Sequence, residues 1–351
     1  MRETAGNIQA SSSRLKILVY GAGAVGQGVG CLLGAAGHEI HLVLRGRYAA
    51  RIQKEGLSVS GIFGDYEVTP LKVGLHESIK GIQDQPFDYV LITTKSYDTA
   101  EAVNDLRRMK DQHFIAVSMQ NGCGNVELLA EAFGTDRSLG GRVITGFEIS
   151  RPGHVRITVT ADAVRMGGLV EGQIPESARW LSEAIRDSGI PCEPTPHLRR
   201  HLLAKLLYNC ALNPLGAILG VHYGALAESK HTRAVMDAVV RETFSVISAM
   251  KEKTLWDTAE EYLNEFYGKQ VPATYHHRPS MLQDIEHGKR TEVDALTGYV
   301  YSRGREVGVS TPVCATLSQL VRFREEPATS VLGTDPEAAL NAPTQGEGLR
   351  D

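Results

Sequence analysis

The first half of the chain alternates short apolar runs with segments that have the composition of helices. The continuous apolar runs of strand length are KILVY at 16–20, EIHLVLR at 39–45, DYVLITT at 88–94 and HFIAVSM at 113–119. Because these runs lack a regular alternation of apolar and polar residues, they are typical of strands that are buried on both faces. Such strands occur in parallel sheets with helices on either side. The pattern therefore predicts an α/β domain with a mostly parallel sheet over 15–190.

Two later segments do alternate apolar and polar residues, RITVT at 156–160 and AVRM at 163–166. Alternation indicates a strand with one face in the core and the other in solvent. The turn sequence Pro152-Gly153 lies in the same region. We expect these segments to add an antiparallel edge to the sheet.

A proline-rich segment at 191–196 separates this part of the chain from one with a different pattern. Three prolines in six residues forbid a helix and favour an extended connector, so we place the domain boundary there. Beyond it the apolar residues have helical spacing, which predicts an all-helical domain over 197–325. The two ends, 1–14 and 326–351, are expected to be loose tails, and the first lacks the apolar segment of a secretory signal.

Five helices are expected in the second domain, at 197–219, 232–253, 254–267, 280–303 and 312–324. The first contains Pro214, and the pattern leaves open whether this proline interrupts it. The last follows Thr311-Pro312, a hydroxyl that can cap a helix and a proline that suits its first position.

Composition and charge limit the classes of function. With 37 basic and 41 acidic residues among 351, the net charge is −4 and no run of lysine and arginine appears, so nucleic acid is not an expected partner. No stretch of about 18 uninterrupted apolar residues is present, so we expect no membrane span. Five scattered cysteines without a Cys-x-x-Cys motif argue against disulfides or zinc and favour the cytoplasm. His197 and His201 lack a third ligand of fitting spacing, so no metal is expected.

A glycine-rich turn follows the first predicted strand directly. Its sequence is GAGAVG, and it opens a helix of small residues at 27–36 that a second strand follows. In this context the motif predicts a Rossmann-type dinucleotide site. The first glycine would make the tight turn, the second would let the backbone approach a pyrophosphate, and the third would let helix and strand pack closely. The expected cofactor contacts are Gly21, Ala22, Gly23, Ala24, Val25 and Gly26.

The end of the second strand indicates which dinucleotide is bound. NAD-binding proteins usually carry an acidic residue there, about 20 residues after the glycines, to bind the ribose 2′-hydroxyl. This sequence has Arg45, 19 residues after Gly26. A guanidinium suits a 2′-phosphate, so NADP(H) is predicted as the cofactor. The alternative is an arginine that is only solvated at a strand end.

Polar residues also follow two later strands. Lys95 follows the third apolar run and Asn121 follows the fourth. Ligands of open parallel sheets bind outside the carboxyl ends of the strands. We therefore expect both residues to converge with Gly21 and Arg45 on one crevice.

The first helix of the second domain carries a single polar stripe. Lys205, Asn209 and Asn213 recur every four residues on an otherwise almost wholly apolar helix, which places them on a line about 12 Å long. So narrow a line is typical of an enclosed cleft, where a lysine has an easily shifted pKa and can donate a proton to a substrate oxygen. The alternatives are a thin solvated edge or a contact between domains. Glu292 is either the carboxylate partner of this lysine or an ordinary surface residue.

Six motifs occur in a fixed order along the chain: GAGAVG at 21–26, TK at 94–95, QNG at 120–122, KLLYNCALNPL at 205–215, SMLQDI at 280–285 and RTEVD at 290–294. Together they resemble the ketopantoate reductase (2-dehydropantoate 2-reductase) family. That family joins a Rossmann domain to an all-helical domain of the 6-phosphogluconate dehydrogenase type. Its members are NADPH-dependent enzymes of pantothenate synthesis.

The resemblance implies a role for each candidate residue. Lys205 would be the proton donor, and Glu292 the carboxylate that helps to hold the active site together. Substrate-binding positions are matched by Asn209, Asn213 and Ser280, and cofactor-side positions by Arg45, Lys95 and Asn121. The implied reaction is hydride transfer from NADPH to the carbonyl carbon of a 2-oxo acid, most directly 2-dehydropantoate, which gives pantoate.

Two positions depart from the family pattern. Tyr223 stands where an asparagine commonly contributes to substrate binding, and Cys314 stands where related sequences often have another asparagine. The reaction type is therefore better determined than the 2-oxo acid. A paralogous reductase of a different 2-oxo acid or ketone stays an alternative, as does a regulator that binds NADP(H) without turnover. A homodimer is compatible with the sequence, which does not fix the oligomeric state.

Overall fold

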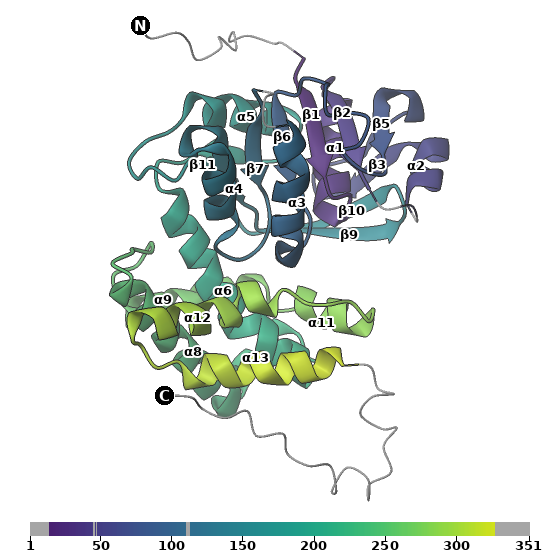
Figure 1. The fold of residues 1–351 in the computed structure, drawn as a ribbon. Helices are drawn as coiled ribbons and strands as arrows, with labels where there is room; N and C mark the ends of the chain where they lie inside the picture. The colour runs from purple at the N-terminus through teal and green to yellow at the C-terminus, as the bar shows by residue number, and fades with distance from the viewer. Residues whose placement is uncertain (1–13, 45, 47, 110–112, 327–351) are drawn as a thin grey trace, which may run out of the picture.

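The computed structural model describes residues 14–44, 46, 48–109 and 113–326, which form a sheet domain and a helical domain (Figure 1). Arg45 and nearly all of the two predicted tails lie outside the described residues. In the view of Figure 1 the helical domain lies below the sheet domain, and helix α6 leads from one to the other.

The sheet domain is built on eight strands in the order β12-β11-β8-β7-β6-β1-β2-β5. They are β1 (Lys16–Tyr20), β2 (Glu39–Val43), β5 (Val73–His76), β6 (Tyr89–Ile92), β7 (Ile115–Ser118), β8 (Ser138–Arg142), β11 (Val164–Gly167) and β12 (Cys192–Pro194). Every neighbouring pair is parallel except β8 and β11. The four continuous apolar runs form the adjacent strands β7, β6, β1 and β2, so the prediction of a mostly parallel sheet is confirmed.

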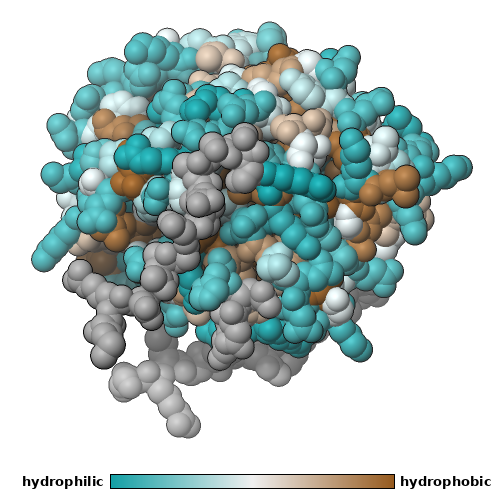
Figure 2. Space-filling view, turned by 90° about the horizontal axis from the view of Figure 1, so that it is seen from above, coloured by the Kyte–Doolittle hydropathy of each residue, from teal (hydrophilic) through white to brown (hydrophobic). Residues whose placement is uncertain are grey.

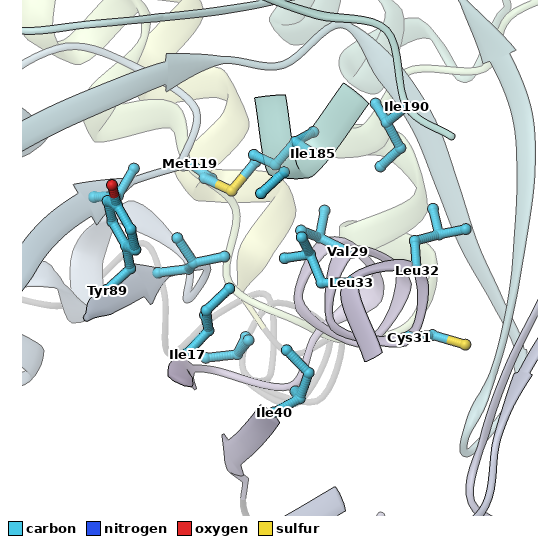
Figure 3. Packing of buried hydrophobic residues seen from close by; sticks show 14 of the residues in the cluster. Ile17, Val29, Cys31, Leu32, Leu33, Ile40, Tyr89, Met119, Ile185 and Ile190 are labelled. Atoms are coloured by element: carbon cyan, nitrogen blue, oxygen red, sulfur yellow. The ribbon is translucent and has the colours of Figure 1, made fainter. Parts of the chain in front are cut away.

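Strand β1 shows why these runs are apolar throughout. The helices of this domain are α1 (Ala24–Ala35), α2 (Ala49–Glu55), α3 (Thr99–Leu106), α4 (Asn125–Phe133) and α5 (Glu176–Asp187). Ile17 and Val19 belong to a core cluster with residues of α1 and α5, part of which Figure 3 shows. Leu18 and Tyr20 belong to a second cluster with residues of α3 and α4. Both faces of the strand are therefore buried, as its sequence indicates.

A second sheet of four strands has the order β4-β3-β10-β9. Its strands are β3 (Leu57–Gly61), β4 (Tyr66–Val68), β9 (Thr145–Arg151) and β10 (His154–Thr160). The single edge predicted for 156–160 and 163–166 is therefore wrong in part. The latter segment forms β11, antiparallel to β8 in the main sheet, but the former lies in β10 of the second sheet. Gly28 of α1 lets this sheet approach, because a Cβ there would lie 2.6 Å from Phe147.

The proline-rich segment at 191–196 is extended but is not a free connector. Its residues Cys192–Pro194 form β12, which pairs in parallel with β11 at the edge of the main sheet. Prolines are tolerated there because an edge strand needs only one row of hydrogen bonds. The sheet domain thus continues to within a few residues of α6.

The helical domain is arranged around α6. Its helices are α6 (Leu198–Leu219), α7 (Tyr223–Glu228), α8 (Lys230–Ala249), α9 (Ala259–Glu265), α10 (Val271–Ala273), α11 (Ser280–Glu286), α12 (Thr297–Val307) and α13 (Pro312–Glu325), with a π-helical turn at Phe266–Gln270. Pro214 lies inside α6 without ending it. Helix α6 is long and apolar enough to cross a membrane by composition, but 72% of that stretch is buried inside the protein. The apolar residues of α6 pack in the core of the helical domain. Seen from above the view of Figure 1, the surface of the molecule is mostly hydrophilic (Figure 2).

Two expectations for the helical domain are wrong. The helix predicted at 280–303 is interrupted, because Gly288 adopts a φ of +61°, a left-handed conformation that commonly ends helices. A short 3-10 turn, Val293–Ala295, then precedes α12. Thr311 precedes α13, but its hydroxyl makes no capping bond. The Glu242 carboxylate instead accepts hydrogen bonds from the N–H groups of Val313 at 2.8 Å and Cys314 at 2.9 Å.

Candidate active site

The glycine-rich turn has the geometry that a dinucleotide requires. Gly21 has a φ of +106°, which only glycine adopts easily. A Cβ on Gly26 would lie 2.2 Å from the carbonyl oxygen of Gly21, so this position must stay small for α1 to pack on β1. Gly23 precedes α1 without a side-chain cap, and a Cβ there would have a neighbour only at 3.9 Å. The first N–H groups of α1 can therefore bind a phosphate that approaches over Gly23.

Lys205 lies where α6 meets the sheet domain. Its amine donates a hydrogen bond of 2.6 Å to Oδ1 of Asn121, which follows β7, and another to the carbonyl oxygen of Val143. Burial lowers the pKa of Lys205 to about 8, although the negative charge of Glu292 acts in the opposite direction. The predicted proton donor therefore has two oxygen acceptors and a pKa of about 8, well below that of an ordinary lysine.

Glu292 is connected to Lys205 through Asn121. The Asn121 amide nitrogen donates to Oε2 of Glu292 at 3.1 Å, and the N–H of Ser96 donates to Oε1 at 3.0 Å. Burial favours a raised pKa for Glu292, but the charge of Lys95, 3.5 Å away, and these hydrogen bonds hold its pKa below the usual value. Glu292 is therefore ionised; its hydrogen bonds reach Lys205 only through the Asn121 amide, while its charge acts on the Lys205 amine through space.

Lys95 forms an ion pair across the domain boundary. Its amine lies 2.5 Å from the Asp284 carboxylate of α11. Burial by itself would lower the pKa of Lys95, but the negative charges of Glu292 and Asp284 outweigh it and raise that pKa above the usual value. Asp284 was not identified from the sequence. Its signal is the spacing of four residues from Ser280, which places both on one face of a helix. Ser96 and Val143 could not be identified from the sequence, because each takes part through a backbone atom and almost any residue type could supply it.

The predicted substrate-binding residues do come together. Asn209, Asn213 and Ser280 line a small cavity with Asn121, Met281, Asp284, Glu292 and Leu296. Asn209 and Asn213 are almost fully buried and line this cavity, whereas Lys205, the third residue of the polar stripe, contacts Asn121 at its edge. The cavity measures about 10 Å³, which is room for about one water molecule.

A larger cleft of about 550 Å³ lies between α4 and α12. Arg199, one of the two arginines that line it, is already paired with Glu127 and Glu252, each at 2.7 Å. Of the predicted site residues that the structure describes, only Glu292 borders it. Within the described part of the chain, no group of three or more His, Cys, Asp or Glu side chains could hold a metal ion.

Comparisons with known proteins follow the same two domains. Residues 17–170 match the family model described as ketopantoate reductase PanE/ApbA, and residues 197–325 match the model of its C-terminal domain. The 2-dehydropantoate 2-reductase of Aquifex aeolicus is 38% identical over 89% of this chain and 97% of its own length. The 2-dehydropantoate 2-reductase of Archaeoglobus fulgidus is 32% identical over 88% of this chain and 97% of its own length.

Solved structures show the same fold. A PanE/ApbA family ketopantoate reductase from Ralstonia eutropha JMP134 superimposes with a TM-score of 0.76 and 30% identity, covering 89% of this chain and 98% of that one. A D-mandelate dehydrogenase with NADH and anilino(oxo)acetate gives a TM-score of 0.79 at 23% identity, covering 89% and 98%, and shows the fold alone. The chain therefore belongs to the ketopantoate reductase family, whose members are oxidoreductases that act on a CH–OH group and use NADPH.

Proposed function

We propose that this protein reduces a 2-oxo acid with NADPH, with 2-dehydropantoate as the substrate and pantoate as the product. The observation that carries the proposal is the position of Lys205. Its amine lies at the junction of the two domains, 2.6 Å from Asn121, and its pKa is lowered to about 8. A lysine with such a pKa is protonated at neutral pH and can still give up its proton readily.

The sheet domain would hold the cofactor. The backbone of Gly21 and Gly23 and the first turn of α1 would bind the pyrophosphate. Arg45 would pair with the 2′-phosphate, an assignment that rests on its place in the sequence. Lys95 and Asn121, after the neighbouring strands β6 and β7, would contact the nicotinamide half. When bound, NADPH supplies a hydride to the carbonyl carbon of the substrate.

Lys205 would complete the reduction. As the carbonyl carbon receives the hydride, the carbonyl oxygen gains negative charge, and the ammonium group of Lys205 donates a proton to it. The product is then a neutral hydroxyl group and Lys205 is left as an amine. Asn121 orients that amine, and the charge of Glu292 helps to keep it protonated before the reaction.

The remaining polar residues of the cavity would bind the rest of the substrate. Asn209, Asn213 and Ser280 line the same cavity as Asn121 and carry groups that can form hydrogen bonds with a substrate. Since a cavity of about 10 Å³ cannot hold a 2-oxo acid, the domains would have to separate to admit it. Such a separation would break the contact between Lys95 and Asp284, together with the hydrogen bond between Lys205 and Asn121.

The names of the relatives favour 2-dehydropantoate, because four enzymes more than 30% identical to this chain carry that activity in their names. The two departures from the family pattern differ in their bearing on this choice. Cys314 is fully buried in the core and does not line the cavity, whereas Tyr223 contacts a cavity residue, Asn213. A paralogous reductase of another 2-oxo acid is therefore the second candidate.

The experiment is a panel of 2-oxo acids assayed with NADPH and NADH side by side. We expect 2-dehydropantoate to have the highest kcat/KM and NADPH to be preferred. A kcat/KM several decades higher for another acid would favour the paralogous reductase. Calorimetric binding of NADPH without its oxidation by any acid would favour a regulator. In Arg45→Ala the ratio of kcat/KM with NADPH to kcat/KM with NADH should decrease. A wild-type preference for NADH would contradict the role given to Arg45.

A further inference from the structure

Tyr223 is held rigidly behind the cavity. It begins α7, only 2% of it is exposed, and its hydroxyl donates a hydrogen bond of 2.9 Å to Oδ1 of Asn213. The ring packs edge to face with Tyr208 at a centroid distance of 5.7 Å and lies 5.2 Å from the ring of His277. The N–H of Tyr223 also donates to the His277 carbonyl oxygen at 3.1 Å. The phenol therefore has little freedom to leave Asn213.

This contact fixes the orientation of the Asn213 side chain. A primary amide has an oxygen that accepts and a nitrogen that donates two hydrogen bonds. Burial raises the pKa of Tyr223 well above its usual value, so the phenol stays protonated and remains a donor. Among the described residues, Asn213 Oδ1 is the acceptor that the phenol proton meets. With its oxygen bound behind the cavity wall, Asn213 is left with its NH₂ group to offer to the cavity.

We propose that Tyr223 is a positioning residue that makes Asn213 a hydrogen-bond donor toward the substrate. The inference rests on the proposed 2-oxo acid reduction and deepens it. The substrate group bound at Asn213 is an acceptor, such as a carboxylate oxygen, and a substrate that places an N–H or O–H donor there is disfavoured. An unfixed amide could turn over and serve either kind of group, so the phenol contributes selectivity that Asn213 alone lacks.

The direct test is Tyr223→Phe, which removes the hydroxyl and keeps the ring. We expect KM for the preferred 2-oxo acid to rise about five- to tenfold, as for the loss of one hydrogen bond, with kcat and the Kd of NADPH within about twofold of wild type. The matched control is Tyr208→Phe. Tyr208 is the neighbouring tyrosine of α6, and its hydroxyl contacts Thr274 at 2.6 Å instead of Asn213. This control should leave KM unchanged, and a wild-type KM in Tyr223→Phe would overturn the proposal.

A double-mutant cycle shows whether Tyr223 acts through Asn213. In an Asn213→Ala background, Tyr223→Phe should have no further effect on KM. An equal rise in KM in both backgrounds would overturn the proposal, because the phenol would then act by another route.

Asn213→Asp provides a test that does not depend on the folding of a Tyr223 variant. An aspartate offers oxygen atoms where the amide offers donors, so KM should rise well beyond that of Asn213→Ala. Wild-type KM in Asn213→Asp would show that no donor is needed at this position and would overturn the proposal. If the wild-type protein reduces no 2-oxo acid at all, the proposed function fails, and that failure is recognised before any variant is made.

Discussion

The Lys205 amine and the Asn121 amide oxygen lie 2.6 Å apart, although the two residues belong to different domains. Asn121 is also bound to Glu292 at 3.1 Å, so one amide group joins the ammonium and the carboxylate. The proposed proton donor would therefore be positioned only when the two domains are together. This arrangement would link domain closure to the chemical step.

Removal of the Lys205 amine should abolish most of the turnover. For Lys205→Ala we expect kcat to fall by about 10²- to 10⁴-fold, the range typical of a lost general acid. The Kd of NADPH, measured by calorimetry, should stay within a few-fold of wild type because the glycine-rich turn is unchanged. Lys269→Ala is the control, since Lys269 is an exposed lysine of the same domain. A Lys205→Ala variant with near wild-type kcat would contradict the assignment.

The rate of reduction should decrease at alkaline pH. In the proposed mechanism the protonated amine of Lys205 is the active form. With a pKa of about 8, this form is fully present well below pH 8 and is lost as the pH rises through that value. We expect the kcat for reduction to be level below about pH 7 and to fall about tenfold per unit above pH 8. The kcat for oxidation of the alcohol should increase over the same range, because that direction needs the neutral amine. A level profile up to pH 10 would exclude Lys205 as the acid.

Neutralising Glu292 should shift the pH at which kcat for reduction begins to fall, the alkaline limb of the pH profile. The charge of Glu292 raises the pKa of Lys205, so Glu292→Gln should lower that pKa and shift the limb to lower pH. Glutamine keeps the size of the side chain and one acceptor oxygen, which can serve either Asn121 or the N–H of Ser96 but not both, because Glu292 uses a separate oxygen for each. The control is Asp294→Asn, two residues further on, whose carboxylate pairs with Arg290 and Arg322 at the surface. An unshifted limb in Glu292→Gln would mean that its charge does not reach Lys205.

Two glycines of the turn should respond differently to alanine. In Gly26→Ala the new Cβ would lie 2.2 Å from the Gly21 carbonyl oxygen, so the free energy of unfolding should fall by about 1–3 kcal/mol. In Gly23→Ala the Cβ has no neighbour closer than 3.9 Å, so thermal stability without cofactor should be unchanged. The same Cβ would obstruct a pyrophosphate, and the Kd of NADPH should rise about tenfold, equivalent to about 1.4 kcal/mol. Tight NADPH binding by Gly23→Ala would place the pyrophosphate elsewhere.

Much of the sheet domain could be predicted because its signals are local. A run such as KILVY is apolar at each position, and this property alone indicates a strand covered on both faces. The turn at Gly21–Gly26 likewise carries its geometry in its own residues. The spacing of Lys205, Asn209 and Asn213 placed them on one face before any partner was known.

The partners of these residues could not be predicted, because each is distant in the sequence. Alternation shows that 156–160 is a strand, but only packing against α1 decides that it joins a second sheet. Thr311 has the right chemistry to cap a helix, yet a carboxylate from residue 242, on α8, takes that place. The sequence shows which side chains could form a given hydrogen bond. Which of them forms it depends on how the folded chain brings distant residues together. The sequence by itself therefore determined the elements, the glycine-rich turn and the polar stripe, and the tertiary structure decided that an amide of one domain joins the lysine and the glutamate of the other.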